Sequence, residues 1–146
     1  PRSVNAYLSW DHDRLDAILE GVFECAKRGD WQAAKALLAD FRVGLHRHIE
    51  LEDNLLFPEY EKRTGIRENG PTSVMRSEHV DIKRYLQGLV EATGSQNLDG
   101  MEEAKAYMLG VLVEHNMKEE EIVYPGTDEM LDDGSREAFV SQVMLR

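Results

Sequence analysis

The sequence has little cysteine, little proline and no long apolar run. Cys25 is the only cysteine, so no disulfide can form within the chain, and a reducing, cytoplasmic compartment is expected. The four prolines, and glycines mostly confined to a few breaks in the sequence, favour long helices over many short strands. No apolar run approaches the roughly 18 residues of a membrane span, and the N-terminal segment lacks the apolar stretch of a secretory signal.

Positive charge is also in deficit. The 146 residues carry 17 Lys and Arg against 28 Asp and Glu, a formal net charge of −11. This balance argues against nucleic acid and against an anionic membrane as a main partner. The length fits one domain, from residue 1 to 146, that can bury a core.

What the sequence has is helical periodicity. Four segments place a residue of core type every three or four positions, which puts each set on one face of a helix. The first set is Leu8, His12, Leu15, Leu19, Val22 and Ala26. The second is Ala34, Leu38, Phe41, Leu45, His48, Glu52 and Leu55, and the third is Met75, His79, Ile82, Leu86 and Leu89. The fourth is Met101, Lys105, Met108, Leu112, His115, Glu119 and Ile122, in which the lysine does not fit.

Polar and glycine-containing stretches separate these segments. They predict an all-α protein, an antiparallel up-down-up-down four-helix bundle with short connections. The predicted hairpins cover about residues 4–63 and 71–125, and an extension over 126–146 is expected to hold a short helix from about Ser135.

The two predicted hairpins repeat one pattern. A shift of 67 residues, without a gap, superposes "HIELEDNLLFP" from His48 on "HNMKEEEIVYP" from His115. Such a repeat indicates one structural unit used twice. The shift superposes His12 on His79, His48 on His115, Glu52 on Glu119, Phe57 on Tyr124 and Pro58 on Pro125.

Six polar residues lie on the apolar faces: His12, His48, Glu52, His79, His115 and Glu119. Each would cost about 1–3 kcal/mol if it were buried without a partner, against a typical total stability of about 5–15 kcal/mol. Hydrogen bonds between histidine and glutamate could satisfy part of the set, whereas a metal centre would satisfy all of it. Histidine and carboxylate donors without thiolate suit iron, manganese, zinc or copper, and a carboxylate-bridged pair in a four-helix bundle favours di-iron. No histidine has a glutamate three residues before it, so the ferritin-like pattern is excluded.

The sequence resembles the hemerythrin-like (HHE cation-binding) family. The resemblance rests on "DHDRL", "HIELEDNLLFP", "EHVDI" and "HNMKEEEIVYP" and spans about residues 8 to 125. It implies a non-heme di-iron centre, with an oxo or hydroxo bridge, that meets O2 or a related small oxidant. By match, the four histidines of the set would be terminal ligands, and Glu52 and Glu119 would bridge the irons.

Two positions depart from the respiratory members of that family. Lys83 stands where those proteins have a second histidine on the third helix, and their spacing of the last carboxylate would select Glu120 rather than Glu119. The departures point away from oxygen storage and toward the bacterial and regulatory branches. The alternatives are therefore an enzyme acting on peroxide or nitric oxide, and an iron- or oxygen-sensing module that acts through a protein partner.

The remaining polar and aromatic residues receive more ordinary roles. His46 lies roughly 200° around the helix from His48 and is expected to face solvent. Asp11 and Glu78 are interpreted as surface residues or as hydrogen-bond partners of the histidines, without an assignment of which. Tyr124 is expected to pack, because its counterpart in the repeat is Phe57.

Overall fold

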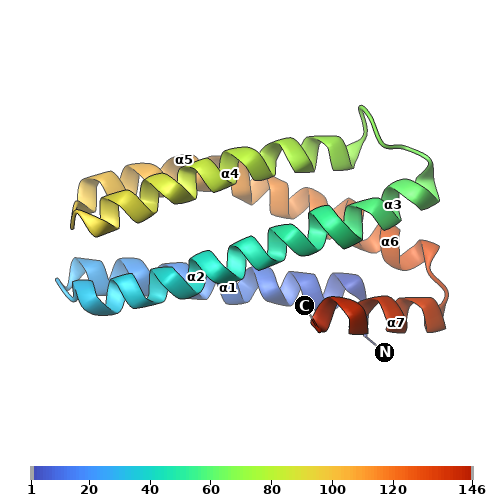
Figure 1. The fold of residues 1–146 in the computed structure, drawn as a ribbon, viewed down its shortest axis with the longest axis horizontal. Helices are drawn as coiled ribbons and strands as arrows, with labels where there is room; N and C mark the ends of the chain where they lie inside the picture. Colours follow the sequence, from blue (N-terminus) through green and yellow to red (C-terminus); the bar gives the residue numbers. More distant parts are fainter. Residues whose placement is uncertain (1, 146) are drawn as a thin grey trace.

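The protein is an all-helical bundle, as the computed structural model of residues 2–145 shows. Two antiparallel hairpins lie one above the other, with α1 and α2 in one layer and α4 and α5 in the other (Figure 1). The helices are α1 (Val4–Lys27), α2 (Trp31–Leu51), α3 (Phe57–Thr64), α4 (Pro71–Gly94), α5 (Leu98–Lys118), α6 (Tyr124–Met130) and α7 (Asp133–Met144). The predicted all-α four-helix architecture is confirmed.

Side chains cap the start of a new helix at the breaks in the sequence pattern. Asp30 accepts a hydrogen bond from the backbone N–H of Ala33 (3.1 Å), and Asn97 accepts one from Gly100 (3.0 Å), so each caps the helix that follows it. Gly29 has a positive φ of 78°, which a glycine adopts at no steric cost. The α1–α2 and α4–α5 connections are therefore tight, and the paired helices are antiparallel.

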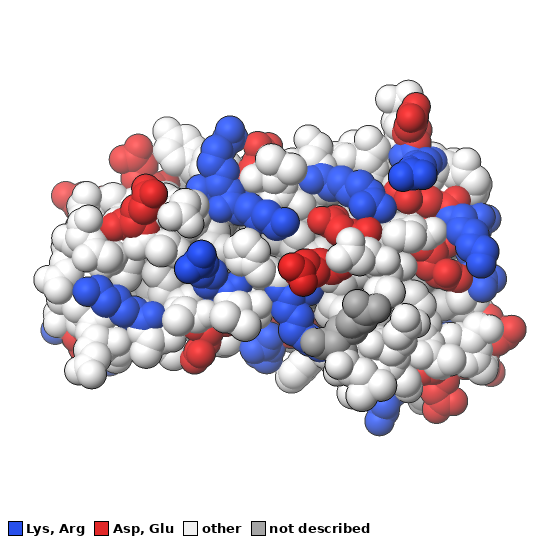
Figure 2. Space-filling view, in the orientation of Figure 1, with Lys and Arg blue, Asp and Glu red and all other residues white. Residues whose placement is uncertain are grey.

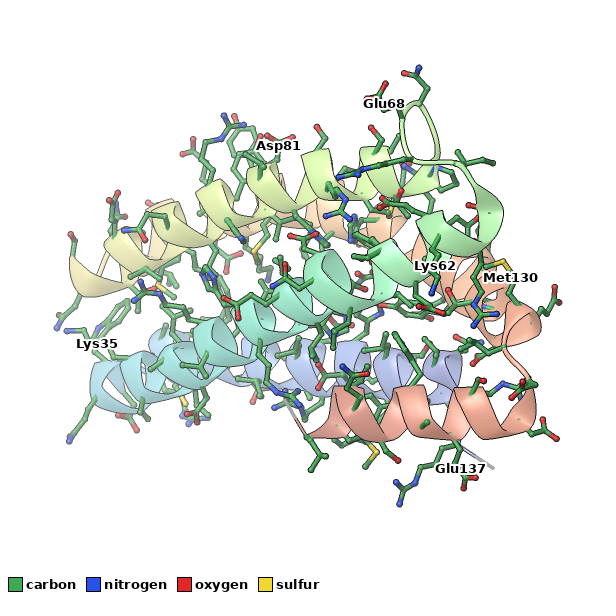
Figure 3. All side chains as sticks on the ribbon, turned by 45° about the vertical axis from the view of Figure 1, so that its right-hand side comes forward. Lys35, Lys62, Glu68, Asp81, Met130 and Glu137 are labelled. Carbon is green, nitrogen blue, oxygen red and sulfur yellow. The ribbon has the colours of Figure 1, made fainter. Side chains whose placement is uncertain are left out.

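Two π-helical turns continue the long helices without a break. The turn η1 (Glu52–Leu56) joins α2 to α3, and η2 (Glu119–Val123) joins α5 to α6. Lys62 on α3 and Met130 on α6 lie at the same end of the bundle, and Glu68, on the loop before α4, projects away from it (Figure 3).

The short C-terminal helix is present and begins two residues earlier than predicted. Asp132 caps it by accepting a hydrogen bond from the backbone N–H of Ser135 (2.7 Å). Val140 and Val143 of α7 are buried against the first turns of α1. Helix α7 therefore covers one end of the bundle, beside the start of the chain (Figure 1).

The apolar interior is divided into two clusters. One, around Leu15, Phe41 and Leu86, fills the end of the bundle with the two tight turns, and the other, around Leu8 and Phe57, fills the opposite end. The polar residues of the four apolar faces lie between the two clusters. The fold thus places them at mid-length, away from both ends of the bundle.

On the face of the molecule that Figure 2 shows, the charged side chains do not gather into a patch of one sign. Acidic and basic side chains are interspersed on the side formed by α2, α4 and α7 (Figure 2). Within residues 2–145, each helix is either too short or too polar to cross a membrane.

Candidate metal centre

Six buried side chains converge at mid-bundle in two overlapping groups. In each group the ligand-type atoms lie within 4.8 Å of one another. The first group is His12, His48, Glu52 and Glu119, and the second is Glu52, His79, His115 and Glu119. All six residues proposed from the sequence are therefore brought together, and the two glutamates belong to both groups.

Glu52 faces both groups at once. Its Oε1 lies 3.0 Å from Nε2 of His79, and its Oε2 lies 3.2 Å from Nε2 of His48. The carboxylate thus divides its two oxygens between two histidines on different helices. This is the arrangement that a carboxylate needs to bridge two cations.

Glu119 has an oxygen without a partner. Its Oε1 lies 3.3 Å from Nε2 of both His12 and His115, whereas its Oε2 is buried and makes no hydrogen bond. A buried carboxylate oxygen left unsatisfied is costly, by about 1–3 kcal/mol or more. A cation beside this oxygen would remove that cost, so the residues present fit a metal.

The π-helical turns aim these glutamates into the bundle. Glu52 begins η1 and Glu119 begins η2, and each accepts a hydrogen bond from a backbone N–H five residues later, that of Phe57 and of Tyr124. A proline stands two residues after each turn and cannot donate to the carbonyl four residues back, which favours the wider turn. Widened turns of this kind are frequent at functional sites.

Each π turn also moves the buried face on by one residue. Leu56 and Val123 are buried, at 1% and 0% exposed, whereas Ile122 is 51% exposed and Leu55 is only partly buried. The prediction that Ile122 lines the core was wrong for this reason, and Leu55 only packs against the edge of the second cluster. An uninterrupted α-helical period misses the extra residue in the turn.

A carboxylate orients each of the four histidines of the cluster from the outside. Asp11 lies 2.8 Å from Nδ1 of His48, and Glu78 lies 3.0 Å from Nδ1 of His115. An Nδ1–H that donates to a carboxylate leaves Nε2 free to bind a metal. The other two pairs are Asp53 with His79 (2.8 Å) and Glu120 with His12 (2.8 Å).

These outer carboxylates obey the repeat as well. Glu78 is the counterpart of Asp11, and Glu120 is the counterpart of Asp53. The carboxylate of Glu120 contacts Nδ1 of His12, on the side of the ring away from the cluster. Glu119, in contrast, belongs to both groups. Of the two rival glutamates, the structure thus brings Glu119 and not Glu120 into the cluster.

The pKa values of the metal-free cluster reflect its carboxylates. Burial alone would lower the pKa of His48, but the charge of Glu52 and the hydrogen bonds to Asp11 and Glu52 raise it to about 10. The pKa of His79 is raised to about 9, because hydrogen bonds to Asp53 and Glu52 outweigh burial. Burial raises the pKa of Glu52, yet the neighbouring His48 holds it well below its usual value. The metal-free cluster therefore binds protons where a cation would otherwise lie.

Tyr124 is part of this cluster, contrary to the prediction that it only packs. It is fully buried, and its phenol lies 3.1 Å from Nε2 of His12 and of His48 and donates a hydrogen bond to Glu52. Burial and the charges of Glu119 and Glu52 raise the pKa of the phenol well above its usual value. The sequence pattern does not reveal this role, because in a regular α-helix two residues five positions apart, such as Glu119 and Tyr124, point about 140° apart.

Other residues considered from the sequence lie elsewhere. His46 is outside both groups, and its burial together with the charge of nearby Lys83 lowers its pKa. A further aromatic pair, Tyr85 stacked on the exposed Tyr107 (5.6 Å between ring centroids), also lies outside both groups. Lys105, the misfit of the fourth set, places its Nζ 4.3 Å from the ring centroid of Phe23.

Lys105 lines an open cleft between α1 and α5, and so its charged group need not be buried in the core. The cleft has a volume of about 430 Å³ and runs along both helices as far as the cluster. A cavity of about 20 Å³ lies inside, against the cluster. His12, Asp16, Leu112 and Asn116 line both spaces. The cluster thus has a route to solvent, and the space at its inner end holds about one or two water-sized molecules.

The chain is a helical bundle that buries four histidines and two shared glutamates, which is the architecture of a cation-binding helical protein. Within that class, residues 4–126 match the hemerythrin HHE cation-binding domain, and the chain belongs to this family. The resemblance seen in the sequence is confirmed. Neither the curated proteins nor the solved structures contain a match to the chain.

Proposed function

We propose that the cluster is a di-iron centre that binds dioxygen or a related small oxidant and then reduces the bound molecule. The observation that carries the proposal is the pair of overlapping groups that share Glu52 and Glu119. The proposed ligands are His12, His48, His79 and His115, one histidine from each long helix, with Glu52 and Glu119 as bridges.

The donor set supports iron. Each group offers two imidazole nitrogens and two carboxylates, without thiolate, and Cys25 lies in the apolar cluster away from the site. Manganese, zinc and copper accept similar donors, but paired carboxylate bridges in a four-helix bundle favour iron. Four protein donors for each metal leave positions open, as reactive metal sites require. Two irons in such a centre can supply two electrons to a bound oxidant.

The residues around the cluster have separate roles. The outer carboxylates fix the rings of the four histidines so that Nε2 points inward. Phe41, Ile82 and Leu112 form apolar walls of the inner cavity and keep bulk water away. The small volume of that cavity limits the ligand to a few atoms, which supports a diatomic molecule or a peroxide over an organic substrate.

The experiment is an anaerobic iron titration followed by oxygen. After loading with Fe(II) and desalting, we expect two irons per chain. Admission of O2 is then expected to give a visible charge-transfer band, and a band that disappears on removal of O2 indicates reversible binding. Fewer than one iron per chain would contradict every di-iron function.

The ligand assignment predicts a contrast between two histidines. His79→Ala is expected to lower the iron content strongly, because it removes a terminal ligand and leaves Asp53 without its partner. His46→Ala is expected to leave the iron content unchanged, because His46 lies outside both groups. Metal analysis of both loaded variants measures the contrast, and equal losses would contradict the assignment.

One observation favours a second candidate, an enzyme that consumes peroxide. Asp16 lines both the cleft and the inner cavity, and burial together with the charges of Asp13 and Glu120 raises its pKa despite the nearby His12. A carboxyl group with a raised pKa beside the cavity is placed to pass a proton to a bound oxidant. Steady evolution of O2 from added peroxide by the iron-loaded protein would support this function, and its absence would leave oxygen binding.

A further inference from the structure

The phenol oxygen of Tyr124 lies in the middle of the first group. It is 3.1 Å from Nε2 of His12, from Nε2 of His48 and from Oε1 of Glu119, and it donates a hydrogen bond to Oε2 of Glu52. These four atoms belong to the four residues of one group. The phenol therefore contacts every member of the first group.

The spacing is that of a ligand atom. Neighbouring donors on one metal, each about 2.1 Å from it, lie about 3 Å apart. His12 and Glu119 approach to 3.3 Å and His48 and Glu52 to 3.2 Å, so the phenol oxygen keeps the spacing that these donors keep among themselves. A phenol has one proton to donate and at most two lone pairs, so four polar neighbours exceed its hydrogen-bonding capacity.

The second group has no such oxygen. Its counterpart in the repeat is Phe57, which also follows a π turn, is fully buried and stacks on His79 with 5.5 Å between ring centroids. The ring of Tyr124 lies similarly against His12, at 5.6 Å. The histidines, glutamates and outer carboxylates all follow the repeat, so the phenol oxygen is a chemical difference between two otherwise matched half-sites.

We propose that the oxygen of Tyr124 is a fifth protein ligand of the metal held by the first group, and that the metal of the second group has no equivalent ligand. This inference rests on the proposed function. Ligation breaks the phenol O–H bond and forms an O–metal bond, and the proton leaves through Glu52, which already accepts it, to the buffer. No electron is transferred in that step.

Two consequences follow for the centre. A phenolate is a hard anionic donor and favours Fe(III), so the first iron is expected to be harder to reduce than the second. The second iron keeps one more open position for an outside ligand. The two irons are thus chemically different, although the backbone that holds them is nearly symmetric.

The test is visible absorption and resonance Raman spectroscopy of the Fe(III)-loaded protein. Wild type is expected to show a phenolate-to-iron band with enhanced tyrosine ring modes. Tyr124→Phe, which removes a single oxygen, is expected to lose that band while it still binds two irons. Tyr60→Phe is the matched control, because Tyr60 is a buried tyrosine outside both groups, and it is expected to keep the band.

A gain of signal is expected from the opposite change. Phe57→Tyr places a phenol at the equivalent position of the second group, and the band is expected to grow about twofold because each phenolate–iron pair contributes independently. Wild type with two irons and no phenolate band, or Tyr124→Phe with an unchanged band, would overturn the inference and leave the di-iron centre intact. Failure to bind iron at all would overturn the proposed function as well.

Discussion

Replacement of Glu119 by glutamine is expected to lower the iron content from two to below one per chain. Glu119 lies in both groups, and its buried Oε2 has no partner other than the proposed cations. Glutamine keeps the size of the side chain but removes the negative charge that offsets two cations. Metal analysis after anaerobic loading and desalting measures the loss, with helical content checked by circular dichroism.

Glu120→Gln provides the matched control one residue away. Glu120 orients His12 through Nδ1 from outside the cluster, so both irons are expected to bind, with affinity about 10–100-fold weaker. A larger loss of iron from Glu120→Gln than from Glu119→Gln would mean that the ligand spacing of the respiratory hemerythrins holds here instead. Equal losses would mean that the two glutamates do not have separate roles.

The parts of the molecule that the sequence predicts well depend on local, periodic chemistry. A residue of core type every three or four positions fixes which face of each helix is buried, so His12, Leu15 and Leu19 had to lie on one side. The exact repeat of 67 residues then made the two half-sites equivalent. Because polar residues on a buried face need partners, the cluster followed from the same pattern.

The parts that the sequence does not predict depend on contacts between helices and on a change of helical period. The partner of Nδ1 of His48 is Asp11, on a different helix, and many carboxylates in this acidic chain were equally eligible. The role of Tyr124 cannot be predicted from an α-helical period, because the π turn between Glu119 and Tyr124 holds one residue more than an α-helical turn. A proline that follows an H-x-x-x-E pair by six residues is the local signal that would have indicated the turn.

Raising the pH from 7 to 10 is expected to destabilise the metal-free protein far more than the iron-loaded one. The folded-state pKa values of about 10 for His48 and about 9 for His79 exceed the unfolded value of about 6.5. The stability that these two protons contribute is therefore full below about pH 6.5, declines as the pH rises, and is lost above about pH 10. Each unit of elevated pKa corresponds to about 1.4 kcal/mol, so the loss amounts to several kcal/mol.

In the iron-loaded protein, the proposed cations would take the place of those protons opposite Glu52 and Glu119, so the same decline is not expected. Urea unfolding midpoints measured anaerobically at pH 6, 7.5, 9 and 10, with and without iron, give the comparison. His46→Gln serves as the control variant, because the pKa of His46 is lowered rather than raised and its loss should leave the alkaline decline in place. A parallel decline in both forms, or a metal-free midpoint that rises with pH, would show that protons and metal do not compete for one buried site.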